Sequence, residues 1–179
     1  MLSLLLTVLT ANAVSIPDAF NPQNALKGLK DFTENWTNEV KKCPADIPFT
    51  CTNDTVISDS CCFEYPGGVL LQTQFWDYYP AVGPDDMFTL HGLWPDRCDG
   101  QYDQFCDPSR EIHSAKSILE SFGETELLNK MSRVWKNFNG NDESLWVHEF
   151  NKHGTCMTTI KESCYSANTK PNQNIVDFY

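Results

Sequence analysis

Eight cysteines within 179 residues are the feature that most constrains how this chain can fold. They are Cys43, Cys51, Cys61, Cys62, Cys98, Cys106, Cys156 and Cys164. An even number of cysteines in an exported chain indicates a disulfide framework that ties distant segments into one domain. None of the spacings is C-x-x-C, which disfavours a zinc ribbon. The sequence alone leaves on the order of a hundred pairings open, although the neighbours Cys61 and Cys62 are not expected to bond to each other.

The N-terminal residues support export. Leu2–Thr10 form a short apolar run, and the small-x-small tripeptide Ala11–Ala13 follows it. This pattern predicts a secretory signal peptide over residues 1–13, because the run is too short to span a bilayer. The alternative is a buried N-terminal helix, since no Lys or Arg precedes the run. Glycosylation sequons at Asn35 and Asn53 agree with export. We expect a protein that is secreted or delivered to the vacuolar or lysosomal lumen, without membrane association after signal removal.

The rest of the chain predicts a polar leader over residues 14–42 and one folded domain over residues 43–179. Segments rich in β-formers and segments of helical apolar spacing are mixed rather than alternating, which indicates the α+β class. Together with the resemblance described below, this leads us to expect a central antiparallel sheet with packed helices. The expected strands are Val69–Trp76 and Phe88–Leu93, and the expected helices are Ser109–Phe122, Glu124–Trp135 and one beginning over Leu145–Lys152.

The formal net charge of −11 restricts the kind of partner that the chain can bind passively. A phosphate backbone is repelled by an acidic surface, so any chemistry on nucleic acid has to come from a small local site. Such a site would work better at acid pH, where carboxylates are protonated and the repulsion falls.

Two segments carry three of the four histidines. His91 lies in Thr89–Asp96, and His148 and His153 lie in Trp146–Cys156. In a helix, Glu149, Lys152 and His153 share one face because they are spaced i, i+3 and i+4, and His148 is about 100° away from Glu149. This face combines groups for acid–base chemistry with a cation that can stabilise an anion. Gly154 is expected to end the helix.

The same residues have other interpretations. Isolated histidines are often structural or solvated, and the charged helix face could simply be exposed. A zinc protease requires H-E-x-x-H, whereas this chain has H-E-x-x-x-H, which places His148 and His153 about 140° apart and disfavours a metal site. His113 lies outside both segments and is expected on a helix surface.

The segments His91–Pro95 and His148–Cys156 resemble the two active-site signatures of the ribonuclease T2 family. The resemblance covers Cys43–Tyr179. It implies an endonuclease that cleaves single-stranded RNA through a 2′,3′-cyclic phosphate to 3′-phosphate ends, with low base specificity. It implies RNA and not DNA as substrate, no metal, no cofactor and a monomer.

The resemblance also implies a role for each matching residue. His153 would be the general base and His91 the general acid. Glu149 and Lys152 would stabilise the transition state, and His148 would hold the phosphate. The base site would be formed by Trp94, Asp96 and Tyr102, with Gln74 and Trp76 as possible neighbours. The implied disulfides are Cys43–Cys62, Cys51–Cys98, Cys61–Cys164 and Cys106–Cys156.

Two further expectations concern the whole chain. A secreted glycoprotein of the same fold that binds without catalysis is the alternative function, and a zinc hydrolase is a more distant one.

Ile175–Tyr179 read as the start of an amphipathic helix capped by Asn172 or Asn174. Family members usually continue beyond such a point, so we expect the domain to be C-terminally incomplete, to fold poorly and to have little activity.

Overall fold

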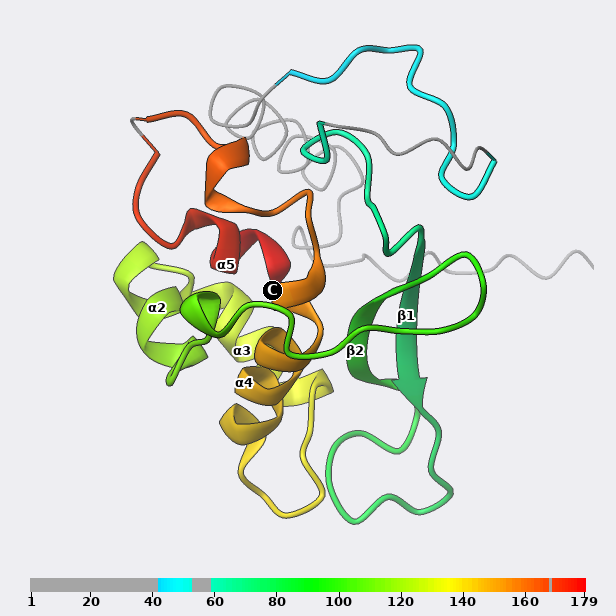
Figure 1. Ribbon diagram of the computed structural model, residues 1–179. Coiled ribbons are helices and arrows are strands. Elements are labelled where there is room, and N and C mark those ends of the chain that lie inside the picture. Colours follow the sequence, from blue (N-terminus) through cyan, green and yellow to red (C-terminus); the bar gives the residue numbers. More distant parts are fainter. Residues whose placement is uncertain (1–41, 53–58, 168) are drawn as a thin grey trace, which may run out of the picture. The chain divides into compact units, whose positions relative to one another are not determined.

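A computed structural model describes residues 42–52, 59–167 and 169–179 (Figure 1). The expected signal peptide, the leader up to residue 41 and the sequons at Asn35 and Asn53 lie outside the described residues. Among the described helices, none is long and apolar enough to cross a membrane. In chain order the elements are β1 (Val69–Phe75), β2 (Thr89–Asp96), the 3-10 turn η2 (Pro108–Arg110), α2 (Ala115–Phe122), α3 (Thr125–Val134), α4 (Asp142–Lys152), the 3-10 turns η3 (Gly154–Cys156) and η4 (Glu162–Cys164), and α5 (Gln173–Phe178).

Strands β1 and β2 form an antiparallel hairpin, which confirms the two predicted strands. The pairing runs from Val69 opposite Asp96 to Phe75 opposite Thr89. The register shifts within the hairpin, because Thr73 pairs with Gly92 and Gln74 pairs with Leu90. His91 therefore has no partner on β1 and is the extra residue of a β-bulge.

The predicted helix over Ser109–Phe122 is divided in the structure. Its first residues belong to η2, and α2 begins only at Ala115. The side chain of Asn151 on α4 binds both backbone groups of Ile112, donating to its carbonyl at 2.9 Å and accepting from its N–H at 2.8 Å. These are the groups that a continuous helix would use, so the helix is interrupted there. Ser114 then caps α2 by accepting from the N–H of Ser117.

Helix α4 begins at Asp142, three residues earlier than predicted, because the Asn141 side chain caps it by accepting from the N–H of Ser144. Its last α-helical residue is Lys152. Gly154 does not end it with a left-handed residue as expected, since the chain continues directly into η3. A Cβ atom on Gly154 would lie 2.7 Å from the Phe150 ring, so this position needs glycine for close packing.

Helix α5 forms where the C-terminal pattern predicts one, and its N-cap residue is Asn172, one of the two predicted, although no side-chain hydrogen bond caps it. Asn172 has a φ of 72°. Asn174 lies inside the helix, is buried, and donates to the carbonyl of Ile160 at 3.2 Å.

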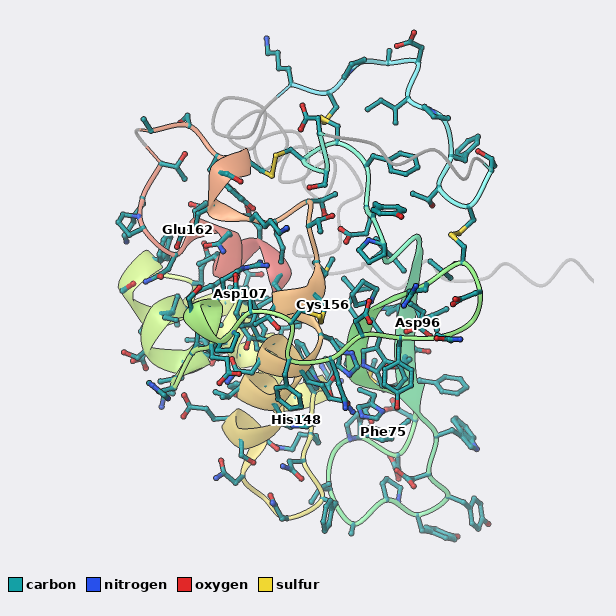
Figure 2. All side chains as sticks on the ribbon, viewed as in Figure 1. Phe75, Asp96, Asp107, His148, Cys156 and Glu162 are labelled. Atoms are coloured by element: carbon teal, nitrogen blue, oxygen red, sulfur yellow. A yellow bond between two sulfur atoms is a disulfide. The ribbon has the colours of Figure 1, made fainter. Side chains whose placement is uncertain are left out.

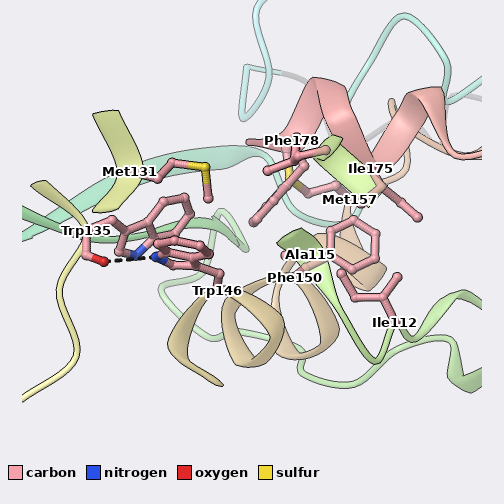
Figure 3. Close-up of a cluster of buried hydrophobic side chains, with 10 residues drawn as sticks. Ile112, Ala115, Met131, Trp135, Trp146, Phe150, Met157, Ile175 and Phe178 are labelled. Carbon is pink, nitrogen blue, oxygen red and sulfur yellow. Dashed lines mark hydrogen bonds between the residues drawn. The ribbon is translucent and has the colours of Figure 1, made fainter. Parts of the chain in front are cut away.

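Buried side chains from α2, α3, α4 and α5 form one core (Figure 3). Phe150 and Leu119 are fully buried at its centre. The indole N–H of Trp146 donates to the backbone carbonyl of Trp135 at 2.9 Å, so the two tryptophans join α4 to the end of α3. Helix α4 also packs against β2, which places the two motif-bearing elements side by side.

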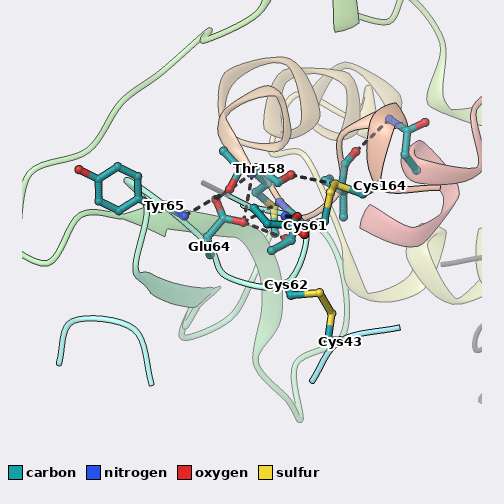
Figure 4. Close-up of a disulfide and its surroundings, with 12 residues drawn as sticks. Cys43, Cys61, Cys62, Glu64, Tyr65, Thr158 and Cys164 are labelled. Atoms are coloured by element: carbon teal, nitrogen blue, oxygen red, sulfur yellow. Dashed lines mark hydrogen bonds between the residues drawn. A yellow bond between two sulfur atoms is a disulfide. The ribbon is translucent and has the colours of Figure 1, made fainter. Parts of the chain in front are cut away.

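Four disulfides connect the described residues: Cys43–Cys62, Cys51–Cys98, Cys61–Cys164 and Cys106–Cys156. They are the same pairs that the family resemblance implies. Beside Cys61–Cys164, the buried Glu64 carboxylate accepts hydrogen bonds from the backbone N–H and the hydroxyl of both Thr158 and Thr159 (Figure 4). The segment after α4 is thus fixed to the N-terminal part of the described chain.

Candidate active site

The Glu149 carboxylate lies at the centre of the two motifs. Only 1% of the side chain is exposed. One oxygen, Oε1, is 3.5 Å from Nε2 of His91, and the other, Oε2, is 3.9 Å from Nε2 of His153. The indole N–H of Trp94 donates to Oε2 at 2.8 Å. Burial raises the pKa of Glu149, while the Trp94 hydrogen bond and the nearby Lys152 act in the opposite direction.

His153 follows the last residue of α4 and is 3% exposed. Its ring stacks on Trp94, with centroids 4.9 Å apart and planes within 17°. Within the described part of the chain, neither ring nitrogen has a hydrogen-bond partner. Burial lowers the pKa of His153 to about 4, and the positive charge of Lys152 contributes to the shift. The ring is therefore held in place by packing and is neutral in mildly acidic solution.

His91 lies in the bulge of β2, and about a third of its side chain is exposed. One face stacks on Phe75 of β1, with centroids 4.3 Å apart, and its edge meets Trp94. Burial lowers its pKa, followed by the charges of His148 and Lys152. His91, Phe75 and His148 line one cavity of about 560 Å³. Figure 2 labels Phe75 on the hairpin and His148 on α4.

His148 is the exposed imidazole of the group and meets the ring of Phe105 edge-on. Its pKa is lowered by burial and then by Lys152. Among the described residues, no group of three or more His, Cys, Asp or Glu side chains is placed to hold a metal ion.

The three expected base-site residues have different environments. Trp94 is half-buried and already engaged on one face by His153 and at its N–H by Glu149. Asp96 is half-buried at the end of β2, opposite Val69. Tyr102 is 57% exposed in the loop that follows.

Phe75 is a neighbour of His91 that the sequence does not single out. Gln74 and Trp76, the possible neighbours of the base site, are both exposed, and Phe75 between them contacts His91. His113 is exposed, as expected, but lies in a bend before α2 and not on a helix.

The turn after His153 is held by Arg110, a residue without any motif signal. Its terminal nitrogens donate to the backbone carbonyls of Gly154, Thr155, Met157 and Ile160. On the other side of the turn, the N–H of Phe105 donates to the carbonyl of Lys152 at 2.9 Å, next to the Cys106–Cys156 disulfide. The end of α4 therefore has covalent and hydrogen-bonded anchors on both sides.

The sequence matches the ribonuclease T2 family over residues 67–179. A ribonuclease T2-like protein of Debaryomyces hansenii is 63% identical over 139 residues, which make up 76% of this chain and 34% of the relative. Ribonuclease T2 of Aspergillus oryzae is 55% identical over 140 residues, which make up 78% of this chain and 50% of the relative.

A solved structure gives the same result. The crystal structure of Actibind, described as a T2 ribonuclease, is similar with a TM-score of 0.72 and 50% identity, covering 78% of this chain and 58% of that one. The chain spans between a third and three fifths of the length of these three proteins. Because the family match extends over more than half of the sequence and includes both motifs, the chain belongs to the ribonuclease T2 family.

Proposed function

We propose that this chain is a metal-independent endoribonuclease that cleaves single-stranded RNA by transphosphorylation. The observation that carries the proposal is the buried Glu149 carboxylate with an imidazole beside each of its oxygens, His91 near Oε1 and His153 near Oε2. Two imidazoles held on one carboxylate can move two protons in one reaction, and the nucleophile is supplied by the substrate.

In the proposed reaction, His153 takes the proton from the ribose 2′-hydroxyl. The 2′-oxygen attacks the adjacent phosphorus, the bond to the leaving 5′-oxygen breaks, and His91 gives a proton to that oxygen. The product is a 2′,3′-cyclic phosphate, which water later opens to a 3′-phosphate. Each proton transfer contributes roughly 10²–10⁴ in rate.

The remaining charged groups stabilise the phosphorane-like transition state. We assign Lys152 to binding the anionic oxygens of the transition state and His148 to holding the phosphate. Glu149 acts on the same transition state through its contacts with His91 and His153. Fixed charges of this kind are effective because they need no reorganisation during the reaction.

For base recognition we keep Trp94, Asp96 and Tyr102 as the proposed site. The exposed ring of Tyr102 can stack on a base, and Asp96 can accept a hydrogen bond from an exocyclic amine. Stacking depends little on base identity, which supports low base specificity. The four disulfides support an oxidising compartment, outside the cell or in the vacuolar or lysosomal lumen, and we propose a monomer there.

The substrate test follows from the 2′-hydroxyl. Single-stranded RNA incubated with the chain and a chelator is expected to be cleaved, whereas DNA and 2′-O-methylated RNA are expected to remain intact. Phosphorus NMR should show a transient 2′,3′-cyclic phosphate. Direct release of 5′-phosphate ends would contradict the mechanism, and binding of RNA without cleavage would favour the non-catalytic alternative.

The pH profile of kcat/KM is expected to be bell-shaped with an acidic optimum. Activity should rise as the base His153 loses its proton near its pKa of about 4. It should fall again as the acid His91 loses its proton. This fall should occur below pH 6.5, the ordinary pKa of a histidine, because burial lowers the pKa of His91. Replacing Lys152 by methionine removes a charge that lowers both values, so both limbs should move to higher pH. An alkaline optimum in the unmodified chain at moderate salt would contradict these assignments.

A further inference from the structure

The bulge in β2 creates a specific problem for the backbone of His91. The residue has no partner on β1, because the ladder passes from Gly92 to Leu90. A residue skipped in this way loses its ladder hydrogen bonds, and its polar backbone groups need other partners if they are away from water. The same bulge directs the His91 side chain, since bulges re-aim side chains near functional sites.

Trp135 supplies the missing partner. Its indole N–H donates to the His91 carbonyl at 2.7 Å, a short hydrogen bond for an N–H donor. The side chain is 4% exposed, so water does not replace this contact readily. The residue directly follows α3, and its position is fixed by its own N–H, which donates to the carbonyl of Met131 at 2.8 Å.

A second hydrogen bond connects the same residue to the helix that carries the other motif. The Trp135 carbonyl accepts from the Trp146 indole at 2.9 Å (Figure 3). Trp146 lies on α4, one turn before Glu149. The Trp146 carbonyl in turn accepts from the hydroxyl of Tyr179 at 2.7 Å. Trp135 thus binds both the strand that holds His91 and the helix that holds Glu149.

We infer that Trp135 is a positioning residue of the active site, whose indole N–H holds the β-bulge so that the His91 imidazole stays beside Glu149 and reaches the leaving oxygen. This role rests on the proposed function of His91 as the general acid. Trp135 itself is buried and does not contact the substrate in this assignment.

The substitution Trp135→Phe tests this role, because it removes the indole N–H and keeps an aromatic ring. With single-stranded RNA, kcat is expected to fall about tenfold with little change in KM, which corresponds to the loss of one well-aligned hydrogen bond. With a uridine 3′-nitrophenyl phosphate, whose leaving group needs no proton, the rate is expected to stay near that of the unmodified chain. Since Trp135→Phe also changes the ring shape, benzothienylalanine at position 135 provides a second variant that keeps the shape and lacks the donor.

Tyr165→Phe is the control, because it also removes one side-chain donor, the hydroxyl that binds Asp177 at 2.7 Å, but not the donor that binds His91. It is expected to lower the melting temperature without changing the ratio of the two substrate rates. NMR titration of labelled histidines adds a readout that does not need turnover: the His91 curve should move in both position-135 variants.

An unchanged rate on RNA, an equal loss on both substrates, or an unchanged His91 titration curve in the variants would overturn the inference. If the unmodified chain does not cleave RNA, the proposed function fails, and the His91 titration still decides whether Trp135 positions this side chain.

Discussion

Replacing His153 by alanine is expected to lower kcat on RNA by roughly 10²–10⁴, the range found when a general base is removed. The ring lies beside the buried Glu149 and stacks on Trp94, and its lowered pKa keeps it neutral in mildly acidic solution. No other described imidazole shares this environment, since His91 and His148 are both more exposed. The measurement is single-turnover cleavage of a short RNA near the optimum pH.

Because His153 is buried, its removal can also affect folding, and the experiment has to separate the two effects. His153→Gln fills more of the space than alanine does, and thermal melts report the stability of both variants. The matched control is His113→Ala, which removes an exposed imidazole outside both motifs and should leave turnover unchanged. If a folded His153→Gln or His153→Ala protein turned over at close to the normal rate, His153 would not be the base.

The second large effect is expected from Gly92→Ala, a change of one methyl group. A Cβ atom at this position would overlap Oε2 of Glu149 and lie 2.8 Å from Nε1 of Trp94. It would therefore displace the carboxylate from both histidines and from its indole donor. Misplacement by about 1 Å can cost on the order of 10² in rate, and overpacking typically costs about 1–3 kcal/mol of stability. Both kcat and the free energy of unfolding should be measured.

Gly100→Ala is the control for the Gly92 variant. Nothing lies within 4 Å of a Cβ atom there, although its φ of 81° makes alanine unfavourable by about 1–2 kcal/mol. The control should lose stability and keep its turnover number, whereas Gly92→Ala should lose both. Normal turnover in a folded Gly92→Ala protein would show that the close approach of β2 to Glu149 is not needed for the reaction.

Much of the site could be predicted because it depends on local periodicity. The spacing of Glu149 and His153 places them on one helix face wherever that helix lies. The hairpin was predictable from runs of β-formers bounded by Gly and Pro. Their convergence on one site was predictable only through the family resemblance, because neither pattern contains the contact between β2 and α4.

Tertiary contacts that override a local pattern account for several features that the sequence could not predict. The helix expected over Ser109–Phe122 is interrupted because Asn151, far along the chain, binds Ile112. The contact of Phe75 with His91 depends on a bulge in β2, which changes the strand residues that oppose each other and is not encoded in the alternation of β1. The use of the Trp94 indole to bind Glu149 likewise depends on a partner 55 residues away.

The arrangement of the four disulfides has a consequence for a protein that meets proteases. Cys61–Cys164 encloses the whole segment from β1 to η4, and Cys51–Cys98 and Cys106–Cys156 close two separate smaller loops that contain β1 with β2 and α2 to α4. A single cut in the loop between β1 and β2, or in the loop before α4, would therefore leave two pieces that remain covalently joined. A nicked chain would keep both halves of the site at high effective concentration, and activity would outlast the integrity of the backbone.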